Sequence, residues 1–222
     1  DPDGWNQLGR LQYRLGDLDA AIRSYERDLA LGNKAEDQSV VAMATGNLGL
    51  IHQARGDLDR AEEMHGKSLE ISQKLNRLDW VANQYGNLGL VHQTRGDLEK
   101  AENMHRKSLE IETELGRKEG MAKQYGNLGI IHAKRGDLEE AEKMHRKSLE
   151  INTELGRKEG MAKQYGNLGS ILYDKGESRG ACELWSKALA LFREMKMPMD
   201  VEKAEAIMRN AGCDDLEPEP PA

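Results

Sequence analysis

The chain repeats itself every 40 residues, and this period limits its fold more than any other feature. The tetrapeptide Gly-Asn-Leu-Gly occurs at residues 46–49, 86–89, 126–129 and 166–169. The tripeptide Gly-Asp-Leu recurs with the same period at 16–18, 56–58, 96–98 and 136–138, and Gly176 continues that series. The segments 116–129 and 156–169 are identical. A period of this size indicates a repeat array in which each unit buries its apolar face against its neighbours.

Each unit is predicted to form two helices, because its apolar residues recur with the helical period rather than alternating. In one unit the first helix is predicted from about Met121 to Arg135 and the second from about Leu138 to Leu155. Gly136 is predicted to end the first helix in the left-handed conformation. Asp137 is predicted to cap the second helix, with Glu140 completing a pairing like a capping box. The unit is therefore a helical hairpin.

Composition excludes several other classes. The 222 residues include 23 glycines, but no proline lies between Asp3 and Met197, which a β-sandwich or a loop-rich enzyme rarely achieves. No apolar stretch is long enough for a transmembrane helix, so membrane insertion is not expected. The net charge of −7 argues against binding nucleic acid through bulk charge. Cys182 and Cys213 suggest no disulfide framework or metal site, and two unpaired thiols favour a reducing compartment, here the cytoplasm.

The repeat resembles the tetratricopeptide repeat. One unit carries its pattern as Tyr125, Leu128, Gly129, Gly136, Leu138, Ala141 and Leu149, and the resemblance extends over about residues 3–195. It implies an all-α fold, a right-handed superhelical solenoid of helix-turn-helix repeats. The usual period of this repeat is about 34 residues. The longer period is similar to that of spindle-orientation scaffolds, kinesin light chains and many bacterial proteins of this family.

This organisation divides the chain into an array, a cap and a tail. Five units are predicted at about 2–41, 42–81, 82–121, 122–161 and 162–199. Residues 200–211 are expected to form a last helix whose polar side caps the array. The acidic, proline-rich residues 212–222 are expected to be disordered. Within each hairpin a glycine is expected to face an alanine, so that the two helices cross closely; the five glycines are Gly9, Gly49, Gly89, Gly129 and Gly169.

The resemblance further implies that the first helices of the units line a concave groove that binds a partner segment. One amide per unit falls in this groove, Gln7 in the first unit and an asparagine in the other four: Asn47, Asn87, Asn127 and Asn167. An amide has two donor hydrogens and an acceptor oxygen, so such a row suits the backbone of an extended peptide. The glycine before each asparagine is expected to leave open space beside the amide. In the alternative interpretation, the asparagines bond neighbouring helices and fix their stacking.

The neighbouring positions predict a groove that is apolar in the middle and basic at both ends. The apolar candidates are Leu50, Leu90 and Ile130; the basic ends hold Lys123, Lys163 and Lys134 at one side and Arg10, Arg14 and Tyr13 at the other. We therefore expect a partner with acidic residues. The lysines with Asn127 and Asn167 also resemble, in part, the carboxylate clamp of some repeats of this family. Lysines that are simply solvated on a helix face are the alternative.

All six histidines fall in two repeated columns, His52, His92, His132 and His65, His105, His145. Imidazoles from facing helices could converge on zinc, but no further ligand recurs with them, so no metal or cofactor is expected. They are predicted to pack as flat rings that bond a serine or a backbone group. Ser68, Ser108 and Ser148 each follow a histidine by three residues, a spacing open to a nucleophile and its base, yet three copies favour packing. No catalytic constellation is visible, so an enzyme is not expected.

The sequence thus predicts a monomeric scaffold or adaptor that binds a protein or peptide, and neither nucleic acid nor membrane. Two alternatives stay open at this point. The chain could be a structural solenoid that assembles with copies of itself, or a regulatory segment of a larger signalling protein or enzyme.

Overall fold

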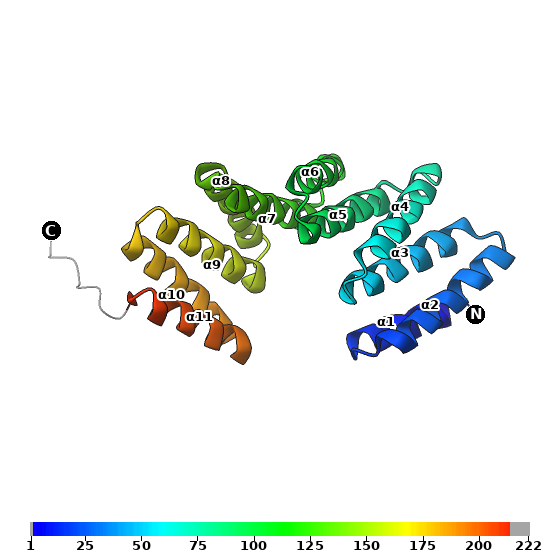
Figure 1. Cartoon of the computed structure of the whole chain (residues 1–222), viewed down its shortest axis with the longest axis horizontal. Coiled ribbons are helices and arrows are strands. Elements are labelled where there is room, and N and C mark those ends of the chain that lie inside the picture. Colours follow the sequence, from blue (N-terminus) through cyan, green and yellow to red (C-terminus); the bar gives the residue numbers. More distant parts are fainter. Residues whose placement is uncertain (1, 214–222) are drawn as a thin grey trace. The chain divides into compact units, whose positions relative to one another are not determined.

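The computed structural model describes residues 2–213, with side chains from Gly4 onward, and this part of the chain is built from eleven α helices (Figure 1). Their bounds are α1 Pro2–Arg14, α2 Leu18–Lys34, α3 Gln38–Ala54, α4 Leu58–Lys74, α5 Leu78–Arg95, α6 Leu98–Glu114, α7 Lys118–Arg135, α8 Leu138–Glu154, α9 Lys158–Asp174, α10 Ser178–Glu194 and α11 Pro198–Asn210. The predicted ends of α7 and α8 are accurate to within three residues. The acidic tail falls almost wholly on 214–222, outside the described residues.

Two compact units make up the chain, residues 1–116 and residues 117–222. In the first, each of the helices α1 to α6 packs against the next, and α3 also contacts α1 and α5. In the second, α7 to α11 pack in the same sequential way, and α7 also contacts α9. The helices thus form stacked hairpins in each unit, and the predicted all-α solenoid of helix-turn-helix repeats is confirmed. The division into five repeats stays a prediction.

The turn inside each hairpin follows from the repeated Gly-Asp-Leu sequence. Gly136 has a φ of +84°, the left-handed conformation that was predicted for it and that glycine adopts at little cost. Asp57 caps α4 by accepting a hydrogen bond from the backbone amide of Arg60 at 3.3 Å. The predicted capping box of α8 is wrong, because the Asp137 side chain caps no amide and Glu140 instead pairs with Lys143 at 3.2 Å.

The glycine inside each first helix faces a ring, not an alanine, so that prediction is wrong. A Cβ added to Gly49 would lie 2.7 Å from Cε1 of His65, and one added to Gly169 would lie 2.5 Å from Nε1 of Trp185. Gly9, Gly89 and Gly129 face Tyr25, His105 and His145 in the same way. The repeated alanines of the second helices are fully buried beside these contacts. Glycine is therefore required here because a ring of the second helix occupies the space of its side chain.

The two cysteines are joined, which corrects the expectation of unpaired thiols. Cys182 of α10 and Cys213, three residues beyond α11, form a disulfide across Cα atoms that are 5.6 Å apart. Such a pair requires α11 to pack back on α10, a contact that spacing along the chain does not reveal. The support that free thiols gave to a reducing compartment is thereby lost. None of the helices in the described part of the chain is both long and apolar enough to cross a bilayer.

Candidate functional site

A cavity of about 390 Å³ opens in the first unit between the first helices of three successive hairpins. Helices α1, α3 and α5 supply eleven of its lining residues, and α4 supplies Ser68. The full lining is Asn6, Arg10, Ala42, Met43, Gly46, Asn47, Leu50, Ser68, Trp80, Asn83, Gln84 and Asn87. Because the repeat brings the same column of each hairpin to the same side, residues 40 positions apart meet at one surface. The structure thus brings together four of the predicted residues: Arg10, Asn47, Leu50 and Asn87.

The side chains of the asparagine column make no hydrogen bond to the part of the chain that the structure describes. None of Asn47, Asn87, Asn127 and Asn167 hydrogen-bonds any residue that the structure describes, and the amide nitrogen of Asn127 is buried without an acceptor there. Hydrogen bonds between histidine and glutamine side chains join successive hairpins instead. All four asparagines are half-buried, so side-chain amides that are exposed to solvent there are available to a ligand. The structure therefore lacks the bonds that the stacking interpretation of these asparagines requires.

Glutamine and histidine join one hairpin to the next. Nδ1 of His65 lies 2.9 Å from Oε1 of Gln84, and Nδ1 of His145 lies 2.8 Å from Oε1 of Gln164. The prediction that these histidines pack as rings is confirmed, since both are almost fully buried. The predicted serine or backbone partner is wrong, because a glutamine of the following hairpin takes that place.

The serines that follow these histidines bond the backbone instead. Oγ of Ser68 donates to the carbonyl of Ala42 at 2.8 Å, and Ser108 and Ser148 repeat this bond with Ala82 and Ala122. All three are buried, as packing residues would be. Within the described residues, no three histidine, cysteine or acidic side chains gather where they could hold a metal ion.

Burial lowers the pKa of four of the histidines. It lowers the pKa of His65 from 6.5 to about 4, against a smaller upward effect of the hydrogen bond with Gln84. Burial also lowers the pKa of His145, His52 and His92. These rings are therefore neutral near pH 7 and add no charge to the chain.

The cavity has one cation and no carboxylate among its lining residues. Arg10 forms no ion pair with any residue in the described part of the chain, although Asn6 beside it donates a 3.2 Å hydrogen bond to buried Asp28. The apolar wall consists mainly of Trp80, Met43 and Leu50. A guanidinium beside an apolar wall suits an acidic ligand that also carries an apolar group.

Trp80 was missed by the sequence analysis, although its repeat column contains a signal. The equivalent positions hold Val40, Gly120 and Gly160, so only this copy carries a large ring. The ring is half-buried at the cavity, and the Arg77 guanidinium stacks on it at 4.0 Å from the ring centroid.

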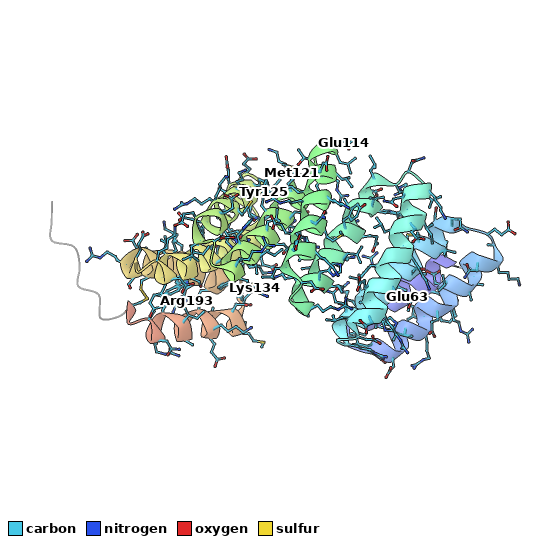
Figure 2. The ribbon with its side chains drawn as sticks, turned by 45° about the horizontal axis from the view of Figure 1, so that its top comes forward. Glu63, Glu114, Met121, Tyr125, Lys134 and Arg193 are labelled. Atoms are coloured by element: carbon cyan, nitrogen blue, oxygen red, sulfur yellow. A yellow bond between two sulfur atoms is a disulfide. The ribbon has the colours of Figure 1, made fainter. Side chains whose placement is uncertain are left out.

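The other predicted residues lie outside this cavity. Leu90 is on α5 and does not line it, while Tyr13 and Arg14 are exposed on α1. Asn127, Asn167, Ile130, Lys123, Lys163 and Lys134 belong to α7 and α9 of the second unit. Figure 2 labels Lys134, which lies near the C-terminal end of α7. Lys163 is engaged by Glu159 at 2.6 Å on its own helix, which agrees with the alternative of ordinary surface lysines.

The predicted open space beside the asparagines exists at only one of the positions for which the surroundings are described. A Cβ on Gly46 would lie 2.8 Å from Nε2 of Gln84, and one on Gly126 would lie 3.3 Å from Nε2 of Gln164. Nothing lies within 4 Å of a Cβ on Gly166. The first two glycines therefore accommodate the glutamine that bonds the preceding histidine.

Comparison with known proteins gives a family and several similar folds. The tetratricopeptide repeat family matches residues 5–39, 40–114 and 120–194. No sequence among curated proteins matches the chain. BtubC (BKLC) from P. vanneervenii is 23% identical over 92% of this chain and 95% of its own, with a TM-score of 0.70. A putative kinesin light chain of Podosopora anserina with nearly identical TPR-like repeats is 18% identical over 89% and 99%, also at 0.70.

A third similar structure was solved with a bound factor. It is a Rap protein complexed with competence and sporulation factor, 18% identical over 92% of this chain, with a TM-score of 0.81. The match spans only 57% of the Rap chain. At these identities the similarity shows the fold alone.

Proposed function

The chain belongs to the tetratricopeptide repeat family, whose fold is a protein-interaction scaffold, and we propose that it binds an acidic peptide, extended or in a short helix, at the cavity of its first unit. The observation that carries the proposal is the pair of unbonded amides of Asn47 and Asn87 in that cavity. Each offers two donors and an acceptor to a peptide backbone. The Rap complex supports it only by showing that a similar fold is found with a bound factor.

The cavity lining supports the chemistry of the peptide. Arg10 supplies an unpaired cation for a carboxylate, and a charge-assisted bond of this kind is about twice as strong as a neutral one. Trp80, Met43 and Leu50 supply an apolar wall for one side chain of the peptide. Aromatic anchors of this kind often provide much of the binding free energy at an interface.

The second unit is proposed to extend the same mode of binding. Asn127 and Asn167 would hold backbone, and Lys123, Lys163 and Lys134 would attract acidic residues. The half-buried side chain of Asn167, which hydrogen-bonds no described residue, supports the first role. The pairing of Lys163 with Glu159 weakens the resemblance to a carboxylate clamp, so we do not propose a clamp.

We propose a monomeric adaptor without catalytic activity in the cytoplasm. Light scattering over a concentration series tests the monomer, because a self-assembling solenoid would grow with concentration. Cell fractionation tests the compartment.

Replacing Asn47 and Asn87 together with alanine is expected to weaken peptide binding about tenfold, because two amide hydrogen bonds to the ligand are lost. The ligand is a peptide selected from a displayed random library on the intact chain, and fluorescence anisotropy measures its affinity. Selected peptides are expected to be rich in Asp and Glu.

The matched control is Asn103→Ala, which removes an exposed amide from α6. It is expected to leave the affinity unchanged, and circular dichroism checks that both variants keep their helices. If the double variant binds the selected peptide as tightly as the parent chain, the asparagines do not hold it.

A further inference from the structure

The disulfide lies at the end of the second unit and plays no part in the proposed peptide site. It joins Cys182, on the second turn of α10, to Cys213, which follows α11 and lies 31 residues beyond Cys182 in the chain. We propose that this bond is a reversible redox latch: a dithiol opens it in the folded protein and so releases α11 from α10. Helices α7 to α9 keep their structure when the latch is open.

Noncovalent contacts hold α11 weakly. Ala204, 9% exposed, is the most buried residue of α11, and Met208 packs against the cluster around Trp185, while Met199 and Ile207 on the same helix are exposed. Arg193 of α10, which Figure 2 labels, pairs with Glu205 at 2.7 Å, but this ion pair is exposed, and exposed pairs contribute little. No side chain caps the N-terminus of α11. At the C-terminal end of this helix the disulfide therefore adds a covalent restraint to the packing of Met208 and Ala211.

Helix α10 packs more firmly against α9 than against α11. α10 buries Ala181, Cys182, Trp185, Ala188 and Leu189. Nε1 of Trp185 donates to the carbonyl of Gly166 on α9 at 3.1 Å, and its ring packs against Tyr173 of α9 at 5.7 Å between centroids. α10 thus stays on α9 when α11 leaves.

The two cysteines differ in exposure, and this difference gives the exchange a direction. Cys182 lies in an apolar cluster with Ala181 and Trp185 and is 7% exposed, whereas Cys213 is half-buried at the edge of that cluster. A thiolate of the dithiol attacks Sγ of Cys213, the disulfide bond breaks, and Cys182 leaves as a thiolate that takes up a proton. The second thiol of the reagent then attacks the mixed disulfide. It releases the Cys213 thiolate and leaves the reagent as an oxidised, cyclic disulfide.

Opening the latch removes Met208 and Ala211 from the cluster around Trp185. The end of the second unit then presents the α10 side that α11 had covered. Protection of backbone amides reports such local release, because only the freed helix opens more often.

Hydrogen exchange on the full chain, with and without dithiothreitol, tests the latch. Peptides that cover residues 198–210 are expected to exchange at least about tenfold faster after reduction, while peptides from α8 keep their rates. Oxidised glutathione, added after the dithiothreitol is removed, is expected to restore the slow rates. The variant Cys213→Ser is expected to show the fast rates in both conditions, with no response to the reductant.

Each other outcome overturns the proposal. If α11 keeps its protection after reduction, the disulfide is not what holds it. If α8 loses protection together with α11, the bond stabilises the whole unit and is no local latch. If thiol titration shows that the bond survives dithiothreitol until the chain is unfolded, Cys213 is not accessible to exchange.

Discussion

Replacing Gly49 with alanine is expected to lower the free energy of unfolding by about 1–3 kcal/mol, the usual cost of overpacking a core. The added Cβ would lie 2.7 Å from Cε1 and 2.8 Å from Nδ1 of His65. The ring cannot move away cheaply, because it is fully buried and its Nδ1 bonds Gln84 in the next hairpin. The clash would therefore either separate α3 from α4 or break the bond between two hairpins. Urea unfolding followed by circular dichroism measures the change.

Gly66 provides a control in the same hairpin and beside the same histidine in sequence. It lies within α4, where a Cβ would meet nothing within 4 Å. Gly66→Ala is therefore expected to raise the free energy of unfolding by up to about 1 kcal/mol, since alanine is the better helix former. Opposite signs for the two substitutions would show that contact, rather than helix propensity, requires Gly49. Equal stabilisation by both would show that the ring of His65 gives way freely.

Gly49 and Gly66 also show which parts of the fold could be predicted from the sequence and which could not. The period and the Gly-Asp-Leu turns are local signals, so the helices and their ends could be predicted closely. What faces Gly49 depends on how two helices cross, and the assumption that small residues face each other was mistaken. The ring column, Tyr25, His65, His105, His145 and Trp185, was already visible as a repeat. That these rings contact the glycines could not be predicted from the sequence, because the contact depends on how the two helices of a hairpin cross.

The candidate site was predictable only where it follows the repeat. Asn47, Leu50 and Asn87 recur by column, and the structure places them in one cavity. Trp80 departs from its column, and a search for regularities passes over such a residue. The disulfide between Cys182 and Cys213 depends on α11 packing back on α10, and a separation of 31 residues carries no signature of that contact.

Lowering the pH from 7.5 to 5 is expected to destabilise the protein, because buried histidines must stay neutral in the fold. Burial holds the pKa of His65 at about 4, whereas in the unfolded chain it is near the ordinary 6.5. Below pH 6.5 His65 binds a proton in the unfolded chain but not in the folded one. The free energy of unfolding therefore falls as the pH falls. The contribution of neutral His65 to the free energy of unfolding is thus fully present above pH 6.5 and is lost progressively down to about pH 4. His65 alone accounts for about 3 kcal/mol over this window.

The position of Nε2 of His65 explains why the folded protein disfavours protonation of this ring. This atom of His65 is buried and has no partner among the described residues, so a proton there would place an N–H without an acceptor in the core. His145, whose pKa burial also lowers, adds to the effect in the same direction. The carboxylates with lowered pKa values, such as Glu62 and Glu142, lose their stabilising charge only below their ordinary value of 4.5. The two classes of group therefore act in different pH ranges.

The first hairpin offers the variant that isolates His65. Tyr25 occupies the equivalent position and packs against Gly9, as His65 packs against Gly49. His65→Tyr keeps a ring in that space but removes the group that titrates between pH 4 and 6.5. Urea unfolding at pH 7.5 and pH 5 is expected to show a smaller loss of stability for the variant, by about 2 kcal/mol. An equal loss in both proteins would mean that His65 is protonated without cost, and that its burial does not control the acid response.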